Sequence, residues 1–215
     1  MIAVLTGDIV SSRQISDKRI LLKLLHEIID RKISHGTKPL KWGVFRGDGF
    51  QVEVPKPSDA LKIALLIRAG LRSSRELHQA DIDARIGIGI GEKGYSAKSV
   101  NESDGEAYQL SGFVLDSFNA QYRLQIKTPW PEIDRHMNIS LSLASALVEN
   151  WSLIQAETAN LWLLENATQV EMAKKLKISQ PAVHKRVNGA HLRAISDVLD
   201  YFEDVISAQV KRGGK

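Results

Sequence analysis

Residues 82–91 constrain the fold more than any other stretch of the chain. Isoleucine or alanine occupies every second position from Ile82 to Ile90, and Gly87, Gly89 and Gly91 occupy alternate positions on the other face. Alternation with a period of two predicts a β-strand with one buried face. Glycines on the other face indicate that a backbone or a ligand approaches that face closely.

The preceding segments supply partners for this strand. Apolar runs predict strands at residues 2–5, 40–45 and 50–54, and a tight Gly-Asp-Gly turn joins the last two into a hairpin. Apolar residues at helical spacing predict helices over residues 16–35 and 58–78. The resulting order is βαββαβ, the ferredoxin-like split arrangement. In that arrangement the first and third strands are neighbours at the centre of the sheet.

Composition limits the class of protein. The chain has 215 residues, of which 43% are hydrophobic and 25% charged, and a formal net charge of +4, which is ordinary for a globular protein of one or two domains. It has no cysteine, which excludes disulfides, thiolate metal sites and cysteine nucleophiles. We find no apolar run long enough for a membrane span and no charged region before the first strand, so we expect a cytoplasmic protein without a membrane partner.

The chain changes character near Thr128-Pro129-Trp130-Pro131, after which all periodicity is helical. We therefore predict an α+β protein with two domains. Residues 1–129 form the ferredoxin-like βαββαβ domain, and residues 130–215 form an all-α domain.

Two Gly-Asp pairs are the first candidate site. Asp8 ends the first strand and Asp48 lies in the hairpin turn, so the predicted topology brings both carboxylates into the same space. Carboxylates are the ligands that Mg²⁺ prefers, and two of them would hold one or two such ions. The alternative is that each pair is only an ordinary turn.

The residues after Asp8 complete this site. Their backbone N–H groups, together with the start of the first helix, would cradle a polyphosphate. The side chains of Arg13 and Arg46 would add positive charge. The cradle would consist of Ile9, Val10, Ser11, Ser12 and Arg13.

The second candidate site is a helix-turn-helix at about residues 154–190. Thr168-Gln169-Val170-Glu171 has the sequence of a capping box, and Ser179 would cap a recognition helix over residues 180–188. Such a helix places its exposed residues against double-stranded DNA, while Val183 and Val187 would face the core. The alternative is a helical hairpin with a solvated basic face. The predicted DNA-binding residues are Lys174, Lys177, Ser179, Gln180, His184, Lys185, Arg186 and Asn188.

Residues up to about 127 resemble the class III nucleotide cyclases. The matching segments are Leu5-Thr6-Gly7-Asp8-Ile9-Val10, Phe45-Arg46-Gly47-Asp48-Gly49-Phe50 and Ala84-Arg85-Ile86-Gly87-Ile88-Gly89-Ile90-Gly91. The resemblance implies that Asp8 and Asp48 bind two Mg²⁺ ions with the carbonyl of Ile9, that the ligand is a nucleoside triphosphate, and that Glu102 contacts a purine. The hairpin acid is also similar to that of GGDEF-type cyclases and palm polymerases.

The chain departs from the cyclases on the helix after the glycine strand. There Gln109 stands where those enzymes have an asparagine, and Phe113 stands where they have an arginine that stabilises the transition state. Such donors are often the largest contribution to catalysis. Nucleotide binding, with Gln109 among the contacting residues, is thus favoured over cyclisation.

The whole chain is also similar to the bacterial SatD family, through Thr-Gly-Asp-Ile-Val-Ser-Ser-Arg near its start and its helical C-terminal region. That resemblance implies no particular reaction.

Three functions remain open. The first is a DNA-binding transcriptional regulator whose cyclase-like domain binds Mg²⁺ and a nucleotide as a sensor. The second is an active Mg²⁺-dependent nucleotide cyclase or nucleotidyl transferase that uses its helical domain for dimerisation. The third is a relic whose first domain only supports dimerisation. All three imply a homodimer, and the final helix, with Ile195, Val198, Leu199 and Phe202, is either its interface or packed onto the helix-turn-helix.

Overall fold

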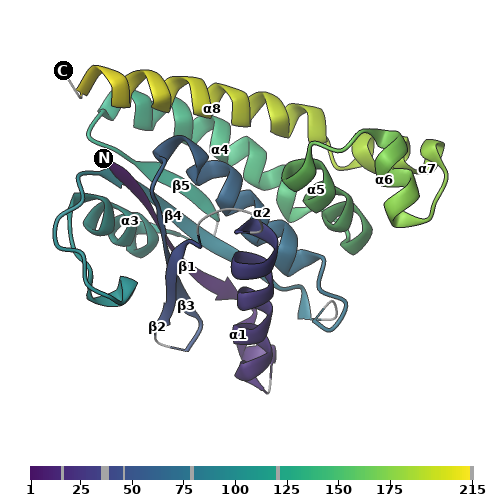
Figure 1. The fold of residues 1–215 in the computed structure, drawn as a ribbon, viewed down its shortest axis with the longest axis horizontal. Coiled ribbons are helices and arrows are strands. Elements are labelled where there is room, and N and C mark those ends of the chain that lie inside the picture. Colours follow the sequence, from purple (N-terminus) through teal and green to yellow (C-terminus); the bar gives the residue numbers. More distant parts are fainter. Residues whose placement is uncertain (16, 35–38, 46, 78–79, 120–121, 214–215) are drawn as a thin grey trace.

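A five-stranded sheet forms the centre of the molecule (Figure 1). The computed structural model describes residues 1–15, 17–34, 39–45, 47–77, 80–119 and 122–213. The strand order is β2-β3-β1-β4-β5, with β5 parallel to β4 and the other neighbours antiparallel. The strands are β1 (Ile2–Val10), β2 (Lys41–Phe45), β3 (Gly49–Val54), β4 (Asp83–Gly91) and β5 (Leu124–Lys127).

The central strand β1 is longer than the apolar run that predicts it. Ladder pairing with β3 continues to Asp8, and ladder pairing with β4 continues to Val10. The prediction that the strand ends at Asp8 is therefore wrong. Asp8 lies within the strand, opposite Gly49 on one side and Arg85 on the other.

Helices cover both faces of the sheet. The helix α3 (Glu106–Ser117) lies on one face, and the remaining large helices share the hydrophobic core on the other. The helix α1 continues as a π-helical segment, Glu27–Ile33. In Figure 1, α8 runs along the top of the molecule, and α6 and α7 form its right-hand end. The other helices are α1 (Lys18–His26), α2 (Ala60–Arg72), α4 (Pro131–Glu149), α5 (Leu153–Glu165), α6 (Gln169–Leu176), α7 (Gln180–Gly189) and α8 (Leu192–Gly213).

The glycine face of β4 receives the backbone of α3. A Cβ atom at Gly89 would lie 2.2 Å from the carbonyl oxygen of Ala107, and one at Gly87 would lie 2.7 Å from that of Ser111. Both distances are too short for nonbonded atoms. The predicted close approach is confirmed, and the approaching group is a helix backbone.

One hydrophobic core extends across the predicted domain boundary. The same cluster of buried residues includes Leu65 of α2, Ile126 of β5, Leu141 of α4, Ala159 of α5 and Phe202 of α8. The helices after residue 129 therefore complete the cover of the sheet. The division at residue 129 remains a prediction, but its two parts share a core.

The apolar face of α8 is used within the chain. Ile195 and Phe202 are fully buried, and Val198 and Leu199 pack partly buried against the same cluster. Ile195 and Phe202 are therefore not available to a partner chain, and the predicted dimer surface is wrong for these two residues. The homodimer itself remains a prediction.

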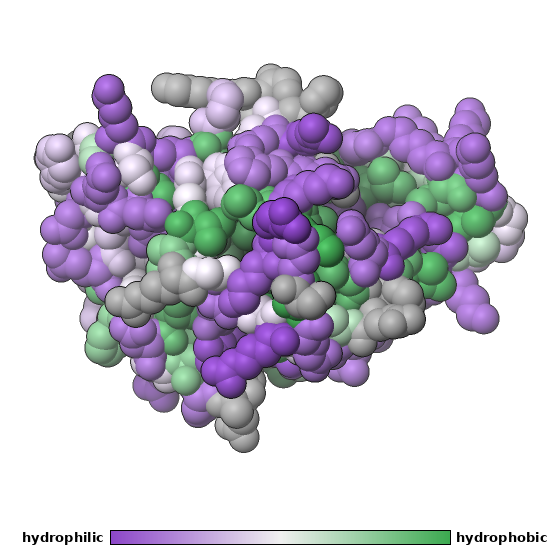
Figure 2. Space-filling model, turned by 90° about the horizontal axis from the view of Figure 1, so that it is seen from below, coloured by the Kyte–Doolittle hydropathy of each residue, from purple (hydrophilic) through white to green (hydrophobic). Residues whose placement is uncertain are grey.

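The α+β class is confirmed, since the sheet is mixed and helices surround it. Seen from below, the surface is largely hydrophilic, with hydrophobic residues in separate patches (Figure 2). Among the described residues, no helix combines the length and apolar character that crossing a membrane requires.

Candidate ligand site and helix-turn-helix

The fold brings the two predicted acids to one cavity of about 560 Å³ at the end of β1, here called the acid pocket. The backbone N–H of Ile9 donates to the carbonyl of Asp48 at 3.1 Å, which fixes the hairpin turn beside β1. The hydroxyl of Ser12 donates to Oδ2 of Asp48 at 2.5 Å. The residues that line the pocket are Asp8, Ile9, Val10, Ser11, Ser12, Arg13, Gln14, Asp48, Arg85 and Arg123.

A reversal at Ser11 shapes one wall of the pocket. Ser11 adopts φ 62°, in the left-handed region, and a short 3-10 turn, Ser12–Gln14, follows. This backbone is strained for a residue other than glycine, by about 1 kcal/mol or more. The reversal turns the chain back, so the buried Ser12 reaches Asp48 while Arg13 remains exposed.

Arg85 is a pocket residue that was not predicted. Its Nε donates to Oδ1 of Asp8 at 2.9 Å, and its Nη2 donates to Oδ2 of the same carboxylate. The hydrogen bond to Asp8 raises the pKa of Arg85, and the charges of Asp8 and Asp48 act in the same direction. Arg85 therefore interacts electrostatically with both acids. Its position on the glycine face of β4 is visible in the sequence, but its register opposite Asp8 is not.

Arg123 is the second unpredicted residue of the pocket. Its Nη1 donates to Oδ2 of Asp83 at 3.1 Å, and its Nε lies 3.6 Å from Oε2 of Glu149. With Arg13 and Arg85, three arginines line the pocket against two aspartates. Arg85 is paired with Asp8, and Arg123 with Asp83 and Glu149, so it is the exposed Arg13 that adds positive charge favouring an anionic ligand.

Asp8 and Asp48 could hold a magnesium ion only together with the phosphates of a bound ligand. Among the described residues there is no group of three or more histidine, cysteine, aspartate or glutamate side chains that could hold a metal. Mg²⁺, however, is commonly held by one or two carboxylates together with substrate phosphates. Asp8 and Asp48 fit that requirement, provided that the ion displaces Arg85 from Asp8.

Other predicted nucleotide contacts lie away from the pocket. Glu102 is exposed in a short 3-10 turn, and Gln109 is exposed on α3, where its Nε2 donates to Oδ1 of Asp104 at 3.4 Å. Phe113 is 65% exposed on the same helix. None of these three lines the acid pocket. Arg46 is outside the described residues.

The helices α6 and α7 have the predicted bounds and caps. Thr168 and Glu171 form the capping box, since Glu171 N donates to Thr168 Oγ1 at 3.3 Å and Thr168 N donates to Glu171 Oε2 at 2.8 Å. The Ser179 hydroxyl accepts from Ala182 N at 3.4 Å. Val183 and Val187 are buried, as predicted.

Most of the predicted DNA contacts share the exposed surface of these helices. Arg186 differs, because its side chain is only 19% exposed and its Nη1 lies 3.7 Å from Oε2 of Glu157 on α5. It therefore packs between α7 and α5. The exposed members are Lys174, Lys177, Ser179, Gln180, His184, Lys185 and Asn188.

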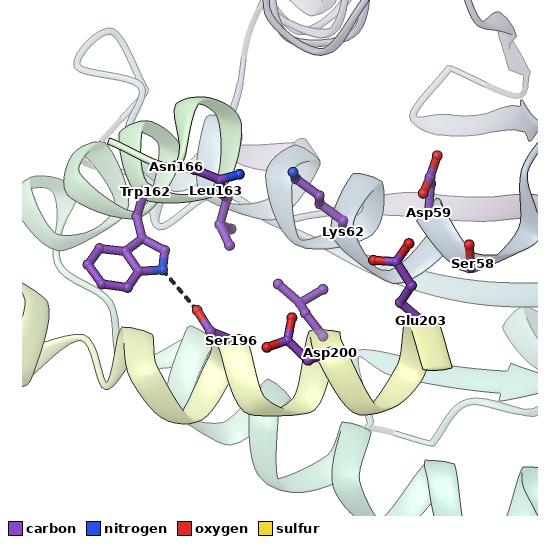
Figure 3. Close-up of a pocket in the computed structure, with 10 residues that line it drawn as sticks. Ser58, Asp59, Lys62, Trp162, Leu163, Asn166, Ser196, Asp200 and Glu203 are labelled. Atoms are coloured by element: carbon purple, nitrogen blue, oxygen red, sulfur yellow. Dashed lines mark hydrogen bonds between the residues drawn. The ribbon is translucent and has the colours of Figure 1, made fainter. Parts of the chain in front are cut away.

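A smaller pocket of about 180 Å³ lies between α2, α5 and α8 (Figure 3). Trp162 Nε1 donates to Ser196 Oγ at 2.9 Å on one side of it. Lys62, Asp200 and Glu203 give it both charges. It contains no predicted site residue.

No protein-family model matches this chain, and no curated protein does so either. The resemblances to the SatD family and to nucleotide cyclases therefore remain expectations, and the function is argued from the two sites.

Proposed function

We propose that this chain is a DNA-binding regulator that senses a nucleotide bound with Mg²⁺ in the acid pocket. The observation that carries the proposal is the joining of Asp8 and Asp48 with three arginines around one cavity. The element order βαββαβ and the strand order β2-β3-β1-β4 support a ferredoxin-like, cyclase-like arrangement for this part of the chain.

Different pocket residues would bind the phosphates and the metal ion. Arg13, Arg85 and Arg123 offer guanidinium groups, which bind phosphate oxygens in pairs. Asp8, Asp48 and the carbonyl of Ile9 would hold Mg²⁺, which neutralises phosphate charge when bound. As the nucleotide takes Arg85, Asp8 becomes available to the ion, so the two bind together.

Sensing is favoured over catalysis. In the cyclases, an asparagine and an arginine at the positions of Gln109 and Phe113 stabilise the transition state. Here both residues are exposed and neither lines the acid pocket, so the pocket has no such hydrogen-bond donor from these positions. The DNA-binding half rests on the exposed polar and basic surface of α6 and α7, which lies at one end of the molecule in Figure 1.

Calorimetry with ATP and GTP, each with and without Mg²⁺, tests the sensor. Asp48→Asn should weaken Mg²⁺-dependent binding at least about tenfold, because it removes a charged ligand of the ion. Asp116→Asn, an exposed acid on α3, is the matched control and should change nothing. Equal affinities for both variants would refute the site. Analysis of the same samples for a cyclic product tests the enzymatic alternative.

Binding to mixed-sequence duplex DNA over a range of salt concentrations tests the helix-turn-helix. Lys177→Ala and Lys185→Ala should each weaken binding and lower the salt slope by about one, since each removes a phosphate contact. Lys211→Ala, on the exposed end of α8, is the control. A salt slope unchanged in all three variants would argue against DNA binding by this surface.

A further inference from the structure

We propose that Arg123 couples the acid pocket to the end of α7 through a buried cluster of ion pairs and Trp151. This inference rests on the proposed function, because it describes how a bound anion would change the DNA-binding helix. The cluster consists of Arg68, Arg72, Asp83, Arg123 and Glu149.

The pocket end of the coupling is Arg123, whose side chain is 24% exposed. It lines the acid pocket and at the same time reaches Asp83 on β4 and Glu149 at the end of α4. Asp83 pairs in the sheet with Val10, which also lines the pocket. A ligand that draws Arg123 outward must therefore weaken its contacts inside.

The centre of the coupling is fully buried. Arg68 binds both oxygens of Asp83, at 2.9 Å and 2.7 Å, and its Nη1 donates to Ser145 Oγ at 2.8 Å. Burial alone would raise the pKa of Asp83, but the charge of Arg68 and its hydrogen bonds hold that pKa below its ordinary value. The Ser145 hydroxyl donates in turn to Glu149 Oε1 at 2.9 Å. The cluster thus connects β4 and α2 with α4.

The far end of the coupling is the corner between α4 and α5. Arg72 donates to the carbonyl of Trp151 at 3.0 Å from Nη2 and 3.2 Å from Nε. The indole Nε1 of Trp151 donates to the carbonyl of Ala190 at 2.9 Å. Ala190 is the C-cap residue of α7, directly after Gly189. Arg72 Nη1 also donates to Oδ2 of Asp83 at 3.4 Å, so polar contacts run from Arg123 through Asp83 and Arg72 to Trp151, and the side chain of Trp151 extends them to Ala190.

The charge balance of the cluster would make it sensitive to an anion bound in the acid pocket. Three arginines share two buried or half-buried carboxylates, Asp83 and Glu149, while the third acid in reach, Asp81, is 78% exposed. An excess charge in a buried setting is costly unless a counter-charge compensates it. A phosphate in the acid pocket would supply that counter-charge at Arg123, and Glu149 would then lose a partner. The α4–α5 corner has two arrangements in this scheme, and the ligand favours one of them.

Hydrogen–deuterium exchange of the full chain tests the coupling, first without any ligand. Arg123→Gln should speed exchange at least about threefold in residues 149–152 and 186–192, because the corner loses a contact that holds it. Arg135→Gln, an exposed arginine on α4, is the matched control and should leave both segments unchanged. No change in residues 186–192 of Arg123→Gln overturns the coupling, and so does a uniform increase over the whole chain, which would show general destabilisation. Trp151→Phe should speed exchange in residues 186–192 while residues 83–91 keep their rate.

The same experiment with Mg²⁺ and GTP separates this inference from the proposed function. In the wild type, bound GTP should change exchange in residues 186–192. In Trp151→Phe, which changes no residue of the acid pocket, it should not, although calorimetry still detects GTP binding. Binding without any change in the wild-type segment refutes the coupling and leaves the sensor site intact. Absence of binding refutes the sensor, and the comparison without ligand then judges the coupling alone.

Discussion

Asp8 and Arg85 face each other across β1 and β4, and their pairing sets the resting state of the acid pocket. Both oxygens of the carboxylate are engaged by one guanidinium group. A divalent cation must compete with that group for the same oxygens. The pocket in this state is therefore better prepared for an anion than for a bare metal ion.

Arg85→Gln should tighten the binding of Mg²⁺ in the absence of nucleotide, by up to about fivefold. The pair is half-exposed, and such pairs contribute at most about 1 kcal/mol. Calorimetric titration with Mg²⁺ measures the change, with Arg135→Gln as the control. Equal or weaker binding in Arg85→Gln would mean that Arg85 does not compete for Asp8.

Asp83→Asn should lower the free energy of unfolding by about 3–5 kcal/mol, because it leaves buried arginines without their carboxylate. Asp81→Asn is the matched control, since that acid also lies 3.4 Å from Arg72 but is 78% exposed, and it should cost less than about 1 kcal/mol. Urea unfolding of both variants measures the two losses in the free energy of unfolding. Similar small losses would show that the buried cluster contributes little to stability.

The lowered pKa of Asp83 also predicts the direction of acid sensitivity. An aspartate whose pKa is lower in the folded state stabilises the fold above its unfolded pKa of about 3.9, and this contribution is lost as the pH falls through the folded value. The free energy of unfolding of the wild type should therefore fall more steeply below about pH 4 than that of Asp83→Asn. Parallel curves for the two proteins would contradict the assignment.

At the scale of elements, the contact between β4 and α3 depends on missing side chains. Gly89→Ala should destabilise the protein by about 1–3 kcal/mol, because its Cβ would meet backbone atoms of Ala107 and Ser111 at 2.2 Å and 2.4 Å. Gly112→Ala on α3 itself meets nothing within 4 Å and should stabilise that helix by about 0.5–1 kcal/mol. Thermal unfolding compares them, and the same sign for both would refute this account of the glycine face.

The helix α7 shows how far local patterns reach. Its cap at Ser179 and its buried valines at positions 183 and 187 follow from spacing within ten residues, and they are observed as predicted. Arg186 was expected on the DNA-facing surface, yet it lies against Glu157. The reason is that α5 packs beside α7, and no pattern within α7 indicates that neighbour.

At the scale of the whole molecule, the shared core predicts a single cooperative unfolding transition. Because α4, α5 and α8 bury their apolar faces in the same cluster as the sheet, unfolding either part of the chain exposes the core of the other. Far-ultraviolet circular dichroism and tryptophan fluorescence should therefore give coincident urea transitions. Two separated transitions would instead support independent domains on either side of residue 129.

The sequence by itself determined the α+β class, most strand positions, the bounds and caps of α6 and α7, and the meeting of Asp8 with Asp48. These features depend on periodicity, capping and chain order, which neighbouring residues encode. Only the tertiary structure decided that Arg85 and Arg123 enter the acid pocket and that α8 buries its apolar face within the chain. Those outcomes depend on strand register and on the packing of distant helices. Sequences with the same local patterns could adopt a different strand register or helix packing. A pairing between residues far apart in the chain leaves no signal in the sequence around either residue alone.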